Sequence, residues 1–302
     1  MASVLALLVV SLAFGVLARR LPAFPENTPR AVNAVVLNLA LPALVLRELH
    51  RVQLSPTLAV GAAMLWLQFG LAALFFWALR RPLGLSRGAL GALILTGGLS
   101  NTSFVGLPVI EMVLGPEALG VGVFVDQLGS FLVMATLGIT VAALASGGRA
   151  DPKTIARKVV LFPPFIALAV ALLTRGWPQP DWLQSTLDRL GLMLTPLALF
   201  SVGFQLKLEG LASRAGPLAT GLAFKLVLAP LTIAAVLWAT GAIPVGSTAW
   251  QVTLLECAMP PMVTGGILAA EYDLDPPLAA AMLGVGIPLS ALTLAVAITA
   301  LT

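Results

Sequence analysis

Two stretches of the chain decide its fold: Ser-Asn-Thr-Ser-Phe-Val-Gly-Leu-Pro at residues 100–108, and Glu-Cys-Ala-Met-Pro-Pro-Met-Val-Thr-Gly-Gly at residues 256–266. Each stretch places helix-breaking and polar residues in the middle of a segment that is apolar enough to span a bilayer. A broken helix at membrane depth leaves backbone N–H and C=O groups without partners, which is tolerated only inside protein or beside a water-filled cavity. One such break in each half of a chain indicates a transporter binding site.

The composition indicates an integral membrane protein. Of the 302 residues, 59% are hydrophobic and only 10% are charged, whereas a soluble domain carries about 25% charged residues. The single cysteine, Cys257, excludes an internal disulfide, and the single histidine, His50, provides no cluster of metal ligands. The net charge of +4 comes mainly from basic loop residues of the kind that orient membrane proteins, so we predict no nucleic-acid partner.

Apolar windows of about 20 residues predict ten membrane spans. These are residues 2–18, 30–49, 57–79, 88–114, 117–145, 157–175, 183–206, 214–240, 248–272 and 276–300. The loops after the odd-numbered spans contain Arg19, Arg20, Arg30, Arg80, Arg81, Arg87, Arg149, Lys153, Arg157, Lys158, Lys207 and Arg214, and the other side has only Arg47, Arg51, Arg175 and Arg189. Basic loops face the cytoplasm. Both termini are therefore predicted on the non-cytoplasmic side of the cell membrane, the inner membrane of a bacterium.

The two halves of the chain resemble each other weakly, at an offset of about 154–159 residues. Within this offset Asn101 falls opposite Pro260, and Gly106 falls opposite Gly265. An odd number of spans in each half requires the two repeats to be inverted relative to each other. The predicted fold is an all-α polytopic membrane protein of ten helices. It consists of two inverted five-helix repeats, residues 1–148 and 149–302, with discontinuous crossing helices at spans 4 and 9.

These motifs resemble those of the auxin efflux carrier family, whose fold is shared with bacterial sodium–bile acid symporters. The resemblance covers the whole chain and is most specific at residues 101–108, 225–230 and 258–276. It implies a scaffold domain of spans 1, 2, 6 and 7 and a transport domain of spans 3–5 and 8–10 that slides in an elevator-like movement. It also implies organic-anion substrates, such as auxin or dicarboxylates, and is consistent with a homodimer. The chain lacks the long central cytoplasmic loop of many plant members.

Six residues at the two breaks are predicted to bind substrate. The side-chain amide of Asn101 both donates and accepts hydrogen bonds, which suits a carboxylate, and prolines remove backbone donors and free carbonyl groups. Half-helix N-termini that face the crossing would favour an anion. The alternative is structural, namely an interhelical hydrogen bond from the asparagine and simple kinks at the prolines. The candidate substrate-binding residues are Asn101, Thr102, Pro108, Pro260, Pro261 and Thr264.

Ionisable groups at membrane depth are the candidates for ion coupling. An ionisable side chain there costs about 2.5–3.5 kcal/mol on insertion scales and is a functional hypothesis by default. In the related sodium symporters a Ser-Asn pair at one break and a Glu before the other bind the ion, and Ser100, Asn101 and Glu256 match that pattern. A proton could use the same site. The alternative is a structural network in which Lys225 is the charge partner of a carboxylate. The candidate coupling residues are Ser100, Asn101, Asp126, Gln127 and Glu256.

The predicted function is secondary active transport of small organic anions across the lipid bilayer by alternating access, driven by a proton or sodium gradient. We expect no cofactor other than a sodium ion. An uncoupled organic-anion channel or uniporter, or a membrane sensor on the same fold, is the alternative. An intramembrane enzyme is disfavoured. The Tyr272-Asp273 pair lacks the second catalytic Gly-Asp element of aspartyl intramembrane proteases, and no histidine lies at membrane depth for a serine protease.

Overall fold

The structure, a computed structural model, describes residues 2–148, 151–205 and 214–301. Helices dominate these three segments, which contain no β-strand. Arg149 and Lys207, which were counted among the basic loop residues, lie outside the described residues, as does the first residue of the predicted second repeat.

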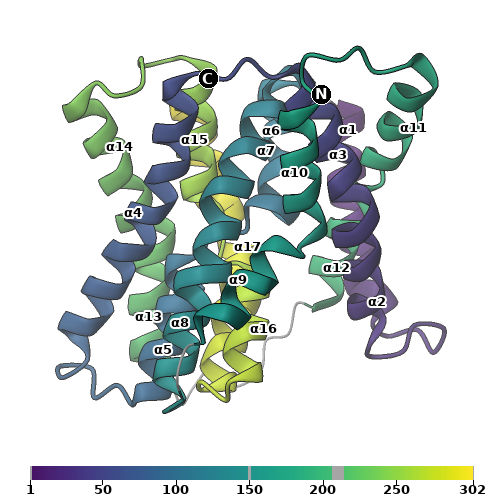
Figure 1. Cartoon of the computed structure of the whole chain (residues 1–302). Helices are drawn as coiled ribbons and strands as arrows, with labels where there is room; N and C mark the ends of the chain where they lie inside the picture. The colour runs from purple at the N-terminus through teal and green to yellow at the C-terminus, as the bar shows by residue number, and fades with distance from the viewer. Residues whose placement is uncertain (1, 149–150, 206–213, 302) are drawn as a thin grey trace.

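One group of helices forms the side of the molecule at the right of Figure 1. In this group α1 packs against α12, and α3 packs against both α10 and α11. These packed faces are apolar, and side chains such as Leu41, Val45, Leu168 and Val202 are buried there. The group consists of α1 (Ala2–Ala18), α2 (Thr28–Val35), α3 (Leu41–Arg51), α10 (Pro163–Leu173), α11 (Asp181–Gly191) and α12 (Leu194–Gln205). The helix α9 (Pro152–Val160), which precedes α10, lies nearer the centre of the picture.

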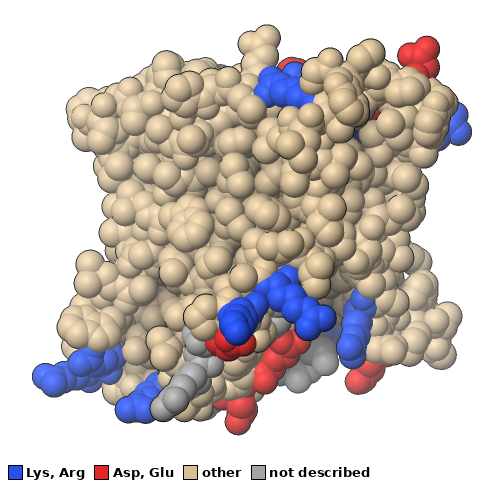
Figure 2. Space-filling model, in the orientation of Figure 1, with Lys and Arg blue, Asp and Glu red and all other residues tan. Residues whose placement is uncertain are grey.

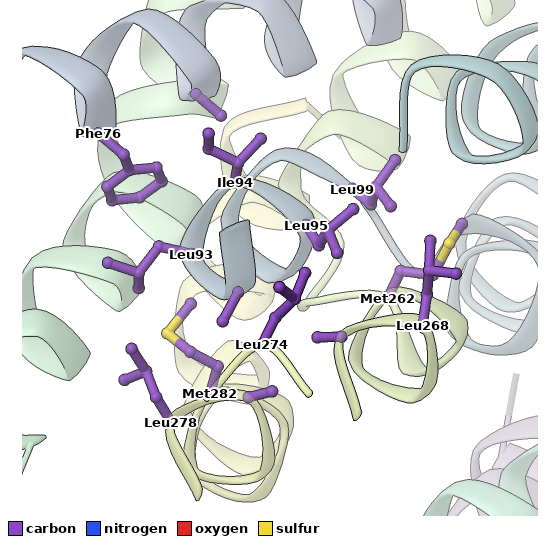
Figure 3. Packing of buried hydrophobic residues seen from close by; sticks show 14 of the residues in the cluster. Phe76, Leu93, Ile94, Leu95, Leu99, Met262, Leu268, Leu274, Leu278 and Met282 are labelled. Carbon is purple, nitrogen blue, oxygen red and sulfur yellow. The ribbon is translucent and has the colours of Figure 1, made fainter. Parts of the chain in front are cut away.

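A second group of helices packs around its own apolar core. Phe76, Leu93, Leu95 and Met282 belong to this core, which joins helices that are far apart in the sequence (Figure 3). The helices that form this core are α4 (Pro56–Leu79), α5 (Arg87–Gly98), α8 (Ile139–Ala145), α13 (Ala215–Ala223), α14 (Ala229–Thr240), α16 (Val263–Glu271) and α17 (Pro276–Leu301). The group also includes α6 (Leu107–Leu114), α7 (Leu119–Val125) and α15 (Thr248–Ala258), of which α7 and α15 pack against α4, and α6 packs against α7.

Wide π-helical turns interrupt several of the helices. The turns η1 (Val36–Ala40), η2 (Thr102–Gly106) and η7 (Phe224–Leu228) each end two residues before a proline. A proline ring collides with the carbonyl group four residues earlier and removes one helical hydrogen bond, so widening the preceding turn accommodates it. Two further turns, η4 (Asp126–Phe131) and η5 (Met134–Gly138), have no such proline. Turns of this kind are frequent at functional sites.

Within the described residues, six helical stretches are long and apolar enough to cross a membrane. They are Thr28–Arg51, Pro56–Leu79, Pro116–Ala145, Asp181–Gln205, Ala215–Thr240 and Pro276–Leu301. The other predicted spans are shorter or interrupted helices. The helix α1 has 17 residues, and the predicted spans 88–114, 157–175 and 248–272 are each divided between two helices. The interruptions of spans 88–114 and 248–272 were predicted from the two breaks. The one within 157–175 was not, because a hydropathy window does not detect where a helix stops and restarts.

The two faces of the molecule differ in charge. Both ends of the chain lie at the upper face in Figure 1. Most of the visible Lys and Arg side chains gather at the lower face, and a broad band almost free of charge separates the two faces (Figure 2). An uncharged band between polar faces is the surface expected of a protein that crosses a bilayer.

Candidate functional site at a crossing of two broken helices

The first break follows α5, which ends at Gly98. Leu99 has an extended backbone, and helical structure resumes with η2 at Thr102. Two glycines at the end of α5, Gly97 and Gly98, lower its helix propensity. The polar side chains that follow can hydrogen-bond outside a helix, which also favours an interruption. The sequence itself therefore ends the helix where the polar stretch begins.

The second break is made by prolines. The helix α15 ends at Ala258, and α16 begins at Val263. Pro260 disfavours helical geometry in the residue before it, and Met259 accordingly has an extended ψ of 152°. Neither Pro260 nor Pro261 has a backbone N–H group. This break therefore leaves fewer donors to satisfy than a break made of other residues would.

The two breaks cross and pair with each other. The backbone N–H of Asn101 donates to the Pro260 carbonyl at 2.9 Å, and the N–H of Met262 donates to the Leu99 carbonyl at 3.1 Å. Together these bonds form a short antiparallel bridge between Ser100 and Pro261. The bridge provides partners for backbone groups that the interrupted helices leave unpaired.

Lys225 reaches this crossing from η7. Its side chain is completely buried, and its ammonium nitrogen donates to the Ser100 hydroxyl at 2.6 Å and to the Cys257 carbonyl at 3.3 Å. The side-chain amide of Gln68, on α4, donates to the same hydroxyl at 3.2 Å. In the part of the chain that the structure describes, no ion pair within 4.0 Å joins Lys225 to a carboxylate.

Asp126 opens η4 and is surrounded by donors. Its Oδ1 accepts hydrogen bonds from the hydroxyls of Thr102 at 2.5 Å and Ser103 at 2.7 Å, and its Oδ2 accepts one from the Gln127 amide at 2.7 Å. The carboxylate is fully buried. It therefore ties η4 to the first turn of helix after the first break.

Glu256 lies one turn before the second break and has a different environment. It is also fully buried, but neither carboxylate oxygen has a hydrogen-bond partner among the described residues. A Cβ atom added at Gly106 would lie 3.0 Å from its Cδ, and one added at Gly122 would lie 3.8 Å from its Oε1. The absence of side chains at both glycines therefore leaves the space that this carboxyl group fills.

Two cavities lie next to the crossing. The larger, of about 1050 Å³, is lined by residues of both helix groups: Arg19, Phe24, Glu26, Asn27, Pro29, Arg30, Asn33, Ala34, Leu37, Phe104, Phe204, Gln205, Thr264, Ile267, Glu271, Ala280 and Leu283. We call it the vestibule. The smaller cavity, of about 60 Å³, shares Leu37, Phe104 and Thr264 with the vestibule and also contacts Asn101 and Asp126. The amide nitrogen of Asn101 has no hydrogen-bond partner within the described segments.

The helix groups are in close contact on the other side of the crossing. A cavity of only about 10 Å³ remains there, with Leu107 and Glu111 on one side and Leu44 and Leu194 on the other. The Thr195 hydroxyl donates to the Glu111 carboxylate at 3.4 Å across the same contact. The vestibule is lined by residues near the start of α2 and the end of α16, which lie at the lower face in Figure 1. The space between the groups is therefore open toward the basic face and closed toward the face with the termini.

Comparison with known proteins identifies the family. A family model described as membrane transport protein matches residues 1–298. The chain belongs to this family. It is the auxin efflux carrier family that the motifs were predicted to resemble, so the resemblance is confirmed. Membership, with the apolar helices, makes this chain a multi-pass membrane transport protein rather than an enzyme.

Two archaeal relatives of this membrane transport protein carry the same general description. An uncharacterized transporter of Methanothermobacter thermautotrophicus is 28% identical over 278 residues, which are 90% of this chain and 89% of the relative. An uncharacterized transporter of Methanocaldococcus jannaschii is 28% identical over 262 residues, which are 83% of this chain and 82% of the relative. The similarity therefore extends over nearly the whole length of each protein.

The structure shows where each predicted site residue of this transport protein lies. Ser100 contacts Lys225, and Thr102 and Gln127 contact Asp126. Asn101 and Thr264 line cavities. The Glu256 carboxyl group has no hydrogen-bond partner within the described segments. Pro260 and Pro261 form the second break, whereas Pro108 lies beyond the first break, in the first turn of α6. Sequence reasoning missed the contacts of Gln68 and Ser103. For Gln68 the available signal was a polar side chain inside a predicted span. For Ser103 it was a hydroxyl next to Thr102 within the polar stretch at residues 100–108.

Proposed function

We propose that the protein is a secondary active transporter that moves small organic anions, auxin-like compounds or other carboxylates, by alternating access at the helix crossing. The observation that carries the proposal is the side-chain amide nitrogen of Asn101. The residue is 2% exposed and lines a cavity that adjoins the vestibule, and this nitrogen has no hydrogen-bond partner within the described segments. A buried amide without a partner loses free energy, and a carboxylate from the vestibule would provide the missing acceptor.

The electrostatics of the breaks also favour an anion. The helices that begin at Thr102 and at Val263 start at the crossing, and the N-terminus of a helix carries a partial positive charge. Thr264, in the first turn of α16, lines both the vestibule and the smaller cavity. The proposed substrate contacts are Asn101, Thr102, Thr264 and the backbone around Pro108, Pro260 and Pro261.

Alternating access follows from the unequal spaces on the two sides of the crossing. A vestibule of about 1050 Å³ on one side and a gap of about 10 Å³ on the other are the features expected of a carrier that is open to one side only. We assign α1–α3 and α9–α12 to the scaffold domain, and α4–α8 and α13–α17 to the transport domain. Sliding of the transport domain would close the vestibule and open the other side. In this proposal the chain crosses the membrane ten times, as two inverted repeats.

The proposed orientation places the basic face in the cytoplasm and both termini outside it, in accordance with the distribution of Lys and Arg (Figure 2). The vestibule then opens to the cytoplasm. A proton or sodium gradient provides the driving force in this proposal. Asp126, Gln127 and Glu256 are the proposed coupling groups, because all three are buried polar residues and two of them, Asp126 and Gln127, line the smaller cavity.

Ligand-dependent thermal stability tests the substrate class. A ligand that binds only the folded protein raises its melting temperature by mass action. We expect at least one organic acid in a panel of monocarboxylates and dicarboxylates to stabilise the wild-type protein, and Asn101→Ala to lose that effect. Asn38→Ala is a matched control, because it removes an exposed amide whose hydrogen bond within the described residues goes to the Ala34 carbonyl, one turn earlier. Proteoliposomes that bind and transport no organic acid under any ion gradient would overturn the proposal.

A further inference from the structure

The ammonium group of Lys225 occupies the part of the crossing where a cation is expected. Two helices, α5 and α15, end at the crossing, and their last carbonyl groups carry partial negative charge. Lys225 contacts the Cys257 carbonyl at the end of α15 and the Ser100 hydroxyl just beyond the end of α5. The two C-terminal ends therefore already have a positive charge that belongs to the chain.

The Ser100 hydroxyl has no lone pair left for a second cation. A serine oxygen has two lone pairs. The Lys225 ammonium donates to this oxygen at 2.6 Å, and the Gln68 amide donates to it at 3.2 Å. A sodium ion that used Ser100 as a ligand would have to displace one of these donors. It would also stand beside an ammonium group that is fully buried, where the repulsion between like charges is weakly screened.

We propose that Lys225 is a tethered cation that takes the place of a sodium ion, so that the carrier binds no sodium at the crossing. The inference rests on the proposed function, because it treats the crossing as the transport site. Of the two driving ions left open above, it excludes sodium at this site. It therefore disagrees with the resemblance, which implies a sodium site at Ser100, Asn101 and Glu256. The ammonium provides the electrostatic support that a bound ion would give to the two broken helices.

The first test compares cations on the wild-type protein without substrate. Melting temperatures are measured in sodium, potassium and choline chloride at equal ionic strength. The proposal predicts equal melting temperatures in the three salts. A rise that is specific to sodium and is lost in Glu256→Gln would overturn it. Because no organic acid is present, this result is independent of whether the substrate class proposed above is correct.

The second test removes the tethered charge. Lys225→Met keeps a side chain of similar length but frees a lone pair of Ser100 and the space beside the Cys257 carbonyl. We expect this variant to gain a sodium-specific rise in melting temperature of about 2–4 °C at saturating sodium, and Lys225→Met/Ser100→Ala to lose it. A folded Lys225→Met protein with no sodium-specific rise would contradict the proposal. Lys153→Met is the matched control, because Lys153 is exposed at the start of α9.

Chemical rescue applies if Lys225→Met does not fold. Lys225→Ala is then purified in the presence of ethylammonium, a cation small enough to replace the end of the lysine side chain. Recovery with ethylammonium, but not with the uncharged ethanol, supports a required positive charge at this position. Equal recovery with ethanol would mean that Lys225 only fills space, and would overturn the proposal. The measurement on the wild-type protein in three salts remains decisive in either case.

Discussion

Asp126 and Glu256 are both completely buried carboxylates. Their surroundings differ. Three side-chain donors contact Asp126, whereas no hydrogen-bond donor contacts the Glu256 carboxyl group within the described residues. Both residues were predicted from the sequence as candidate coupling groups, and the structure shows that their surroundings differ.

The difference shows how a buried polar group can be assigned a role. A carboxylate with a full set of donors stabilises the packing of the elements that provide those donors. A buried carboxyl group without donors loses free energy unless another group or ligand compensates it. By this criterion Asp126 has a structural role in joining η4 to η2, and of the proposed coupling groups Glu256 is the better candidate for one whose partner comes and goes during transport. Four substitutions test the comparison, in decreasing order of their expected effect on stability.

The largest effect is expected for Asp126→Ala. This substitution leaves the donors of Thr102, Ser103 and Gln127 without an acceptor, and each unsatisfied buried donor costs about 1–3 kcal/mol. We expect the free energy of unfolding to fall by roughly 3 kcal/mol or more, measured by thermal or denaturant unfolding in detergent. Asp126→Asn, which still accepts from the two hydroxyls, should lose less than half as much. If Asp126→Ala were as stable as the wild type, Asp126 would not have a structural role.

A smaller loss is expected for Gly106→Ala. The new methyl group would overlap the Glu256 carboxyl group, and overpacking of this kind typically costs about 1–3 kcal/mol. Combining it with Glu256→Ala makes room for the methyl group. The double variant should therefore lose less free energy of unfolding than the sum of the losses in the two single variants. A double-mutant cycle measures this coupling. Strict additivity would show that Gly106 and Glu256 do not share this space.

Little change in stability is expected for Glu256→Gln. The carboxyl group makes no hydrogen bond that the substitution could remove, so the free energy of unfolding should change by less than about 1 kcal/mol. Transport, measured in proteoliposomes with a substrate from the ligand panel, should instead fall by more than about tenfold, the factor that corresponds to 1.4 kcal/mol. A variant that transports normally would show that Glu256 is a passive buried group.

Most of the fold was predictable because it depends on local chemistry. The Gly-Gly and Pro-Pro pairs locate both helix interruptions, and they do so without any information on tertiary contacts. The helix boundaries of the long spans follow the hydropathy of the sequence to within a few residues. The interruption at Phe162 was missed, because Pro163 and Pro164 lie in an apolar window that hydropathy alone reads as continuous.

The contacts of the candidate site were less predictable because they depend on the crossing. The sequence suggested Asp126 or Glu256 as the partner of Lys225, on the ground that a buried charge needs an opposite charge. The structure pairs Lys225 with a hydroxyl and a helix-terminal carbonyl instead. Helix termini carry partial charges that do not appear in the residue types. A pattern of charged residues therefore could not identify this partner.

The smallest effect is expected for Asp151→Ala, which provides an exposed counterpart of Asp126. Its carboxylate also receives three hydrogen bonds, from the backbone N–H groups of Lys153 and Thr154 and from the Thr154 hydroxyl, at the start of α9. Asp151 is exposed, so water replaces the carboxylate when it is removed. The loss of stability should be well below that of Asp126→Ala. Equal losses would mean that the number of donors, and not burial, sets the difference.

The pH dependence of the Asp151 contribution has a definite sign. The hydrogen bond from the Thr154 side chain, together with those from the two backbone N–H groups, lowers the pKa of Asp151 below its ordinary value of 3.8. A lowered pKa in the folded state stabilises the fold above the pKa of the unfolded chain, and this contribution is lost as the pH falls through the folded value. The difference in melting temperature between the wild type and Asp151→Ala should therefore be constant near neutral pH and decrease progressively as the pH falls below about 4. A difference that persists in strong acid would show that the hydrogen bonds do not depend on the charge of Asp151.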